Sequence, residues 1–416
     1  MNFLHVFQGI GTLFEQDPQI AFGRVILILL GVVLVWLGNK RILEPLIMVP
    51  MGFGMAAINA GMLFKFAIML DGDPNATMNL TNIIIAPMAS TTSSLMNVMQ
   101  INFLQPIYTL TFSNGLIACL VFMGIGAITD VSPVLKYPFT SMLIAMFAEL
   151  GTILTFPLAT AMGFTPGEAA ATAIIGGADG PMVLFASLRL APNLFVPITI
   201  IAYLYLSICY GLYPFIIKAL IPKHLRAQAI DLQKKDNRSI SPKAKLMFDI
   251  IACAVLCILL PMAAPLFLSF FLGNAIKEIL EKKYNELLEN VFLYTATFFL
   301  GLLLGVLCDA NMLLGDPRVL KLLVLGFFAL IVAAIGGIGG GYLVWLINRR
   351  NFNVVVGVAG VSCVPTTAKL AQQSVSALDK KVFIMQFAMG ANVCGVITTT
   401  ILTGLYVTLV LPYVTG

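Results

Sequence analysis

The residues most able to carry chemistry lie where long apolar segments are interrupted. The first interruption is the sequence GGADGP at residues 176–181, which has apolar flanks on both sides. Each flank is too short to cross a bilayer, which takes about 20 apolar residues. Gly177, Gly180 and Pro181 disfavour a continuous helix, because glycine loosens the backbone and proline lacks an N–H. The pattern predicts a helix broken at membrane depth, with Asp179 at the break.

Asp179 is therefore a candidate ligand for a small cation. A carboxylate at the centre of a bilayer costs about 2.5–3.5 kcal/mol on insertion scales, so such a group usually has a function. Backbone carbonyls freed by a broken helix are tolerated where they line a cavity or are buried in protein. Carboxylate and carbonyl oxygens together are the ligands that sodium needs. The alternative is a re-entrant loop in which Asp179 only caps a half-helix.

A second interruption covers residues 353–365 and contains Asn353, Gly357 and Ser362. Ser362 follows Asn353 by nine residues. A continuous helix of that length rises about 13.5 Å, so the two side chains share an ion only if the helix breaks sharply. Two cation sites at different depths are expected.

Three further polar residues lie within apolar segments. Asn392 lies in the sequence GANVCG, which is predicted to break the last apolar segment. Its amide oxygen suits a hard cation, although an interhelical hydrogen bond is an equal alternative. The spacing around Tyr205 favours a core aromatic residue over a proton donor. Glu149 is expected to pair with Arg189 or with a backbone group, or to be a second proton-carrying carboxyl.

Composition identifies the class of protein. The 416 residues are 59% hydrophobic and 10% charged, with a mean hydropathy of +0.97. These values predict an all-α polytopic membrane protein, because the strands of a membrane barrel would alternate polar and apolar residues. The net charge of +5 is concentrated in loops, which argues against nucleic-acid binding. Both histidines lie outside the apolar segments, which excludes a histidine metal site or a Ser-His-Asp triad within the membrane.

The segments that must position these residues are predicted from their hydropathy. Membrane-crossing segments are expected at residues 24–38, 45–63, 104–127, 138–164, 194–218, 245–260, 291–308 and 319–347. Residues 79–103 are rich in Ser, Thr and Met and are expected to be re-entrant or interfacial. Residues 218–245 carry eight Lys or Arg against two acids, so the positive-inside rule places them in the cytoplasm.

The order of these features predicts two repeats. We expect an N-terminal segment at 1–23, a first transmembrane repeat at 24–220, a basic cytoplasmic linker at 221–245 and a second repeat at 246–416. In this division Asp179 before Pro181 corresponds to Ser362 before Pro365.

Charge placement indicates that the repeats are inverted. Lys40 and Arg41 place the end of the first crossing inside, and counting crossings then places residues 165–168 outside. Arg349 and Arg350, before the second interruption, should be inside. Two hairpins entering from opposite faces would then meet near the midplane, provided that residues 261–276 cross the membrane.

With these residues in view, the chain resembles the beta subunits of sodium-pumping, biotin-dependent decarboxylases, which include the oxaloacetate, methylmalonyl-CoA and glutaconyl-CoA enzymes. The resemblance runs from about residue 24 to the C-terminus. The GGADGP sequence and the N-x3-G-x4-S pattern from Asn353 are its most specific matches. Further matching stretches are residues 44–54, 124–130, 191–192, 202–205, 299–302 and 388–393.

The resemblance implies an elevator-type sodium pump that decarboxylates carboxybiotin and consumes a proton. It implies that Asp179 and Tyr205 are catalytic, and that both bind sodium with Asn353 and Ser362, while Gly357 is structural. The implied partners are a carboxyltransferase alpha subunit, a biotin carrier protein and a small single-span gamma or delta subunit. The chain would be a homo-oligomer in the bacterial inner membrane.

Departures from the family pattern leave the acyl substrate open. Residues 366–369 read TTAK where the family usually has Met-Ala-Ala-Arg, and Glu149 stands where the family often has Gln. The printed sequence lacks a biotinylated Met-Lys-Met motif, so carboxybiotin is expected from a partner. A sodium-coupled carboxylate symporter and a purely structural membrane subunit are the other classes that remain.

Overall fold

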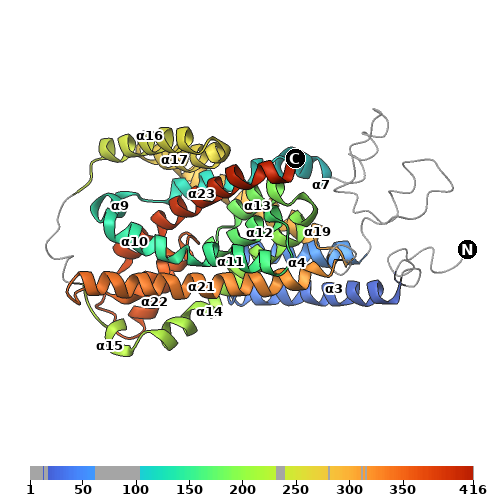
Figure 1. The fold of residues 1–416 in the computed structure, drawn as a ribbon, viewed down its shortest axis with the longest axis horizontal. Coiled ribbons are helices and arrows are strands. Elements are labelled where there is room, and N and C mark those ends of the chain that lie inside the picture. Colours follow the sequence, from blue (N-terminus) through green and yellow to red (C-terminus); the bar gives the residue numbers. More distant parts are fainter. Residues whose placement is uncertain are drawn as a thin grey trace, which may run out of the picture. The chain divides into compact units, whose positions relative to one another are not determined.

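The computed structural model describes Leu13 and residues 17–60, 104–230, 239–279, 282–310, 313 and 316–415, and the regular secondary structure of these residues is all helical (Figure 1). The segment 79–103, expected to be re-entrant or interfacial, lies outside the described residues. In chain order the longer helices are α3 (Pro18–Asn39), α4 (Pro45–Asn59), α8 (Leu116–Ile128), α10 (Pro138–Ala148), α11 (Leu150–Ala161), α12 (Pro166–Ala173), α13 (Gly180–Leu190), α14 (Phe195–Leu220), α16 (Pro242–Leu259), α17 (Ala264–Ile279), α19 (Leu293–Leu307), α21 (Arg318–Ile347), α22 (Thr366–Ser376) and α23 (Met385–Thr415). Short helices are α7 (Leu104–Ile107), α9 (Ser132–Lys136), α15 (Lys223–Arg226) and α18 (Lys282–Glu286).

Seven helices among the described residues are long and apolar enough to cross a membrane. They are Pro18–Asn39, Pro138–Ala161, Pro192–Cys209, Pro261–Ile279, Lys283–Leu307, Arg318–Ile347 and Met385–Val414. The prediction of a polytopic helical membrane protein is confirmed. Residues 261–276, on which the inverted topology depends, fall in one of these helices, which has 19 residues.

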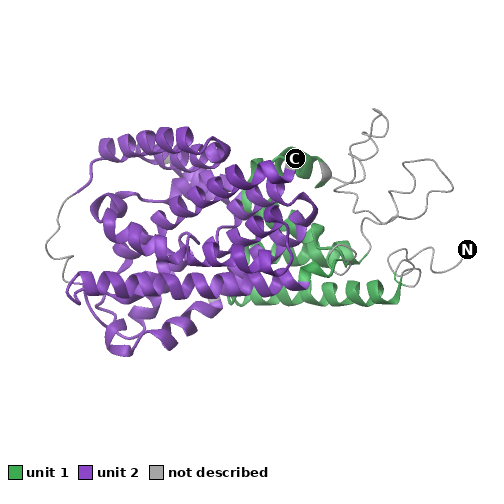
Figure 2. Ribbon diagram, in the orientation of Figure 1, with its two compact units in different colours: residues 1–117, 296–319 green, residues 118–295, 320–416 purple. Residues whose placement is uncertain are grey.

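The chain divides into two compact units (Figure 2). Unit 1 contains residues 1–117 and 296–319, and unit 2 contains residues 118–295 and 320–416. Within unit 1, Arg24 is fully buried and donates from Nε to the carbonyl of Asn59 at 2.8 Å. The Asn59 amide in turn donates to the carbonyl of Cys308 at 2.7 Å. These bonds hold α3, α4 and the end of α19 together.

Unit 2 contains both predicted helix breaks. α23 contacts α10, α12, α13 and α22, as well as the 3-10 segments η2 (Ile174–Gly177) and η7 (Val354–Gly360). The two breaks are therefore packed against a single long helix.

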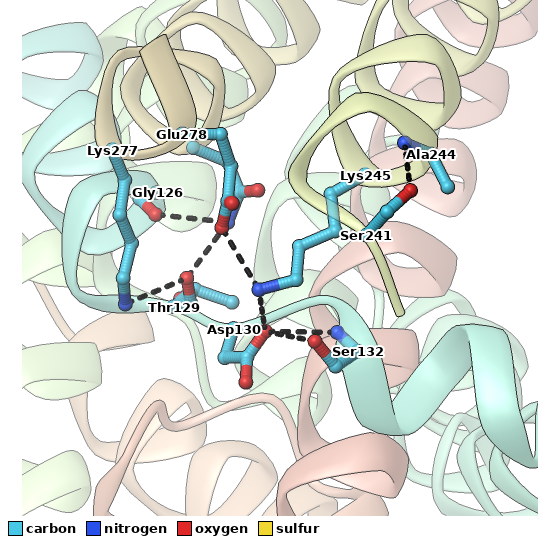
Figure 3. A network of polar contacts seen from close by, with 10 residues as sticks. Gly126, Thr129, Asp130, Ser132, Ser241, Ala244, Lys245, Lys277 and Glu278 are labelled. Carbon is cyan, nitrogen blue, oxygen red and sulfur yellow. Dashed lines mark hydrogen bonds and ion pairs between the residues drawn. The ribbon is translucent and has the colours of Figure 1, made fainter. Parts of the chain in front are cut away.

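A polar network in unit 2 joins the turn between α8 and α9 to the α16–α17 pair (Figure 3). The Lys245 ammonium lies 3.2 Å from the carboxylate of Asp130 and 3.0 Å from that of Glu278. Asn274 donates to the carbonyl of Thr129 at 2.8 Å. Burial by itself would raise the pKa of Asp130, but hydrogen bonds from Ser132 and the Lys245 charge outweigh it and hold that pKa below 3.8.

The structure corrects two expected element boundaries. The segment 104–127 is not one crossing: the π-helix η1 (Tyr108–Phe112), which follows α7, ends at Phe112, and a turn that includes Gly115, with φ of 78°, leads into α8. The break expected around Asn392 is absent, because α23 continues from Met385 to Thr415. Its glycines serve close packing instead. A Cβ on Gly395 would lie 2.3 Å from the carbonyl oxygen of Gly360.

Candidate functional site

The first helix break is built as the sequence predicts. α12 begins with a capping box, in which Thr165 and Glu168 satisfy each other's backbone N–H groups, and ends in the 3-10 segment η2. Ala178 then adopts the left-handed conformation with φ 55°, and Asp179 is extended before α13 begins. Pro181 lies in the first turn of α13, where its missing N–H costs nothing.

Asp179 is 4% exposed and accepts a hydrogen bond from the Met182 N–H at 3.3 Å. It therefore caps α13, as the alternative interpretation expected. Among the described residues, no other donor bonds to this carboxylate, so capping engages only Oδ1. The cap and a ligand role are compatible, because Oδ2 is not used by the cap.

The second break lies directly against the first. η7 ends at Gly360, and Ser362 follows before α22. Ser362 donates to the carbonyl of Gly177 from both its N–H, at 3.2 Å, and its Oγ, at 2.7 Å. Gly177 and Ser362 thus bring the two breaks into contact.

Asn392 reaches the second break from α23. Its amide nitrogen donates to the carbonyls of Ala359 and Val361 and to the hydroxyl of Thr367, at 2.9–3.1 Å. Its Oδ1 is buried and has no hydrogen-bond partner among the described residues. The amide nitrogen therefore makes hydrogen bonds to neighbouring segments, as the alternative interpretation of Asn392 expected. The amide oxygen retains the free lone pairs that a cation ligand requires.

Asn353 lies at the other end of η7. Its Oδ1 accepts from the Val355 N–H at 2.9 Å, and its Nδ2 donates to the carbonyls of Arg226 and Gln228 at 3.1 and 2.7 Å. A 3-10 helix rises about 2.0 Å per residue, so the seven residues of η7, which lie between Asn353 and Ser362, span about 14 Å. The structure does not bring these two side chains together.

Gly357, between them, is a packing position. A Cβ there would lie 2.3 Å from the carbonyl oxygen of Gly337 on α21. Its small size therefore lets η7 and α21 approach at backbone contact.

Two tyrosines on α14 have different surroundings. Tyr205 donates its hydroxyl to the carbonyl of Leu323 at 2.6 Å and packs on Gly326 of α21. Tyr203 is 2% exposed, and its hydroxyl has no partner among the described residues. A Cβ on Gly180 would lie 2.7 Å from that hydroxyl oxygen, so Tyr203 adjoins the residue that follows Asp179.

Sequence reasoning did not single out Tyr203. Residues two apart on a helix point about 200° away from each other, so only one of the pair can face the break. The sequence holds no signal for which one does, because both neighbourhoods are apolar.

One interpretation of the sequence expected Glu149 to pair with Arg189, but the structure does not contain this pair. Arg189 instead donates to the carbonyl of Met262 at 2.7 Å and stacks 4.0 Å above the Phe185 ring. Glu149 is 4% exposed and accepts hydrogen bonds from threonine hydroxyls.

These features define a class: a multi-pass membrane protein in which two broken helices and one long helix enclose buried oxygen atoms. Residues 23–410 match the family described as Na+-transporting oxaloacetate decarboxylase beta subunit. The chain belongs to this family.

Similar proteins agree with this assignment. The chain is 51% identical to the carboxybiotin decarboxylase of Malonomonas rubra over 404 residues, with 97% of each chain covered. It is 31% identical to the oxaloacetate decarboxylase beta chain of Klebsiella pneumoniae, covering 97% of this chain and 98% of the relative. It is 30% identical to the methylmalonyl-CoA decarboxylase subunit beta of Veillonella parvula, covering 95% and 96% respectively.

Proposed function

We propose that this chain decarboxylates carboxybiotin presented by a partner subunit and couples that reaction to sodium export at the Asp179 break. The observation that carries the proposal is the contact of two broken helices at Gly177 and Ser362, beside a buried carboxylate. The family assignment supplies the reaction, and this geometry supplies a place where sodium would bind. The relative most similar among those named above is called a carboxybiotin decarboxylase.

The chemistry sets what the residues must do. Loss of CO2 breaks the bond between the carboxyl carbon and the ureido nitrogen of biotin, and the electron pair left on nitrogen takes up a proton. Moving each sodium ion out against about 100 mV costs about 2.3 kcal/mol before any concentration difference. Coupling therefore requires that decarboxylation occur only in the ion-loaded state. In the simplest scheme, sodium displaces a proton from Asp179 or a nearby tyrosine, and that proton reaches biotin.

We propose Asp179, Ser362 and Asn392 as ligands for sodium. Asn353 and Tyr205 are proposed as ligands at a second depth in the membrane. Asn392 is supported by its free buried Oδ1, and Ser362 by its place on the Gly177 carbonyl. Tyr203 joins this set, because its unpartnered hydroxyl adjoins Gly180. Tyr205 would have to release the Leu323 carbonyl before acting as ligand or proton donor.

We further propose that residues 24–220 and 246–416 are inverted repeats working as an elevator. The support is that breaks at corresponding places in the two halves contact each other, and that residues 261–279 form an apolar helix of 19 residues. In this scheme the basic residues 218–245 face the cytoplasm and attract an acidic carrier domain. The carboxyltransferase alpha subunit, biotin carrier and single-span subunit complete the assembly in the inner membrane, with this chain as a homo-oligomer.

Inside-out vesicles separate this function from a sodium–carboxylate symporter. With a carboxybiotin carrier added outside, sodium should accumulate in the lumen and CO2 should appear, and avidin should block both. Asp179→Asn should abolish both activities, while Asp130→Asn, which changes a half-exposed ion pair, should retain them. If avidin does not inhibit sodium movement, and a free dicarboxylate drives it, the protein is a symporter instead.

A further inference from the structure

Glu149 is an acidic side chain projecting from the middle of an apolar helix. It lies at the junction of α10 and α11, within the 24-residue apolar helix Pro138–Ala161. Its N–H donates to the Ala145 carbonyl at 3.1 Å, and its own carbonyl accepts from Ile153 at 2.9 Å. The backbone is therefore helical on both sides, and the side chain is held at a defined depth.

Three threonine hydroxyls surround its carboxylate. Thr152, one turn along α11, donates to Oε2 at 2.8 Å. Thr398 and Thr399, on α23, both donate to Oε1, the former at 3.3 Å. Thr152 and Thr399 are fully buried, so the cluster is closed on two sides.

The cluster has oxygen ligands but no counter-charge. Among the residues that the structure describes, no basic side chain forms an ion pair with Glu149. Hydrogen bonds from hydroxyls stabilise a carboxylate without neutralising it, and an unneutralised charge in an apolar interior is costly. A bound cation would remove that cost.

Thr398 can also turn from a donor into a ligand. The Thr398 hydroxyl lies 3.0 Å from each of the carbonyls of Cys394 and Gly395. Its hydrogen therefore has acceptors other than Glu149, which frees its oxygen lone pairs to face a cation. One carboxylate and three hydroxyl oxygens are a ligand set of the type that hard cations prefer.

Two residues of this cluster adjoin the glycines of the Asp179 break. A Cβ on Gly177 would lie 2.9 Å from the Thr399 hydroxyl oxygen, and Gly177 is also the residue whose carbonyl accepts from Ser362. A Cβ on Gly176 would lie 2.4 Å from the Thr152 nitrogen. The carboxyls of Glu149 and Asp179 interact electrostatically, so neutralising one changes the energy of charging the other.

We propose that Glu149, Thr152, Thr398 and Thr399 form a further position for a monovalent cation, distinct from the Asn353 level and coupled through Gly177 to the Asp179 site. The ligand class is sodium or a proton, which share the requirement for a carboxylate in an apolar setting. The inference rests on the proposed function only in taking sodium as the cargo.

The test counts both cations on the purified full-length chain in complex with its partner subunits. Equilibrium binding of ²²Na+ gives the number of ions per chain, and a pH indicator in weak buffer gives the protons released when sodium is added. Glu149→Gln should bind one sodium ion fewer than wild type if the position takes sodium. If the position takes a proton, the sodium count should stay and the proton release should fall.

Thr152→Val and Thr155→Val form a matched pair, because both threonines are fully buried on α11. Thr155 donates only to the carbonyl of Gly151 in its own helix, at 2.7 Å. Thr152→Val should weaken the affinity for whichever cation occupies the position about tenfold, the equivalent of one lost ligand. Thr155→Val should behave as wild type. This pair retains the Glu149 carboxyl, so it remains informative if Glu149→Gln fails to fold.

Sodium counts and proton release that are the same in wild type, Glu149→Gln and Thr152→Val would overturn the proposal. Failure of the proposed function has a different signature. In that case decarboxylation by the wild-type complex would not depend on sodium at all, while the binding counts would still be measurable.

Discussion

Ser362 makes two hydrogen bonds to a single backbone oxygen, the carbonyl of Gly177, which lies 185 residues away in the sequence. The carbonyl is available because Ala178 turns left-handed directly after η2, so no helical N–H follows to take it. The two breaks are thereby tied to each other rather than left open. In the proposed site this bond would hold the Ser362 hydroxyl in place as a sodium ligand, and so link ion binding to the relation between the hairpins.

Ser362→Ala and Asn353→Ala should therefore have different effects. The first keeps the N–H bond and loses the Oγ bond, and should raise the half-saturating sodium concentration about tenfold, as a net loss of about 1 kcal/mol or slightly more implies. The second removes three hydrogen bonds at the start of η7 and should lower the melting temperature as well. Ser187→Ala is the control, since that buried serine bonds only within α13. Unchanged sodium titrations in both variants would exclude both residues from ion binding.

Alanine at the site glycines should destabilise the fold through overpacking. A Cβ on Gly177 would lie 2.2 Å from Thr399 Cγ2, and one on Gly357 would lie 2.3 Å from the Gly337 oxygen. Such overpacking typically costs about 1–3 kcal/mol. Gly211→Ala, within α14 and with no atom within 4 Å of the added Cβ, should be neutral or slightly stabilising. Thermal unfolding in detergent measures this, and equal melting temperatures for Gly177→Ala and Gly211→Ala would contradict it.

The sequence predicted the two breaks because their cause is local. Three glycines and a proline within six residues stop a helix whatever surrounds them, and the same holds for the glycines and Pro365 of the second interruption. The burial of Asp179 follows from its apolar flanks. Local backbone chemistry is what a single sequence states most directly.

The sequence alone could not identify which distant segments contact each other. Gly390 and Gly395 resemble a break but serve contact with neighbouring segments, such as the backbone at Gly360, so α23 stays helical. The choice between Tyr203 and Tyr205 depends on what lies beside each face of α14. Glu149 finds threonines on α23, about 250 residues away, where the sequence offered Arg189 as a nearer basic partner.

The two tyrosines should separate in a pair of conservative variants. Tyr203→Phe removes a buried hydroxyl that has no partner, so it should not lower the melting temperature. Tyr205→Phe removes the hydroxyl that bonds to the Leu323 carbonyl, which lies within α21, and the loss of this one hydrogen bond should cost about 0.5–1.5 kcal/mol of stability. If Tyr203 serves the Asp179 site, its variant should lower sodium-dependent decarboxylation at least about tenfold at unchanged stability. Full activity in Tyr203→Phe would leave Tyr205 as the tyrosine of the mechanism.

The inverted repeat predicts opposite exposure of the segments that precede the two hairpins. Single cysteines at Pro166 and Arg350 should test this, since both side chains are exposed. Gly167 is a poor choice, because a Cβ there would lie 2.2 Å from the Leu190 carbonyl oxygen. The half-buried native cysteines, Cys119, Cys253, Cys257 and Cys363, should first be replaced by alanine.

In intact cells a membrane-impermeant maleimide should modify Pro166→Cys and spare Arg350→Cys, which should react only after permeabilisation. Lys243→Cys, at an exposed position in the first turn of α16, supplies the reference for the face that the basic residues 218–245 occupy. The physical reason is the positive-inside rule, which predicts that Arg349 and Arg350 lie on the cytoplasmic side with residues 218–245. If Pro166→Cys and Arg350→Cys react from the same face, the hairpins enter from one side. The two repeats would then be parallel, and an elevator built on inverted halves would be excluded.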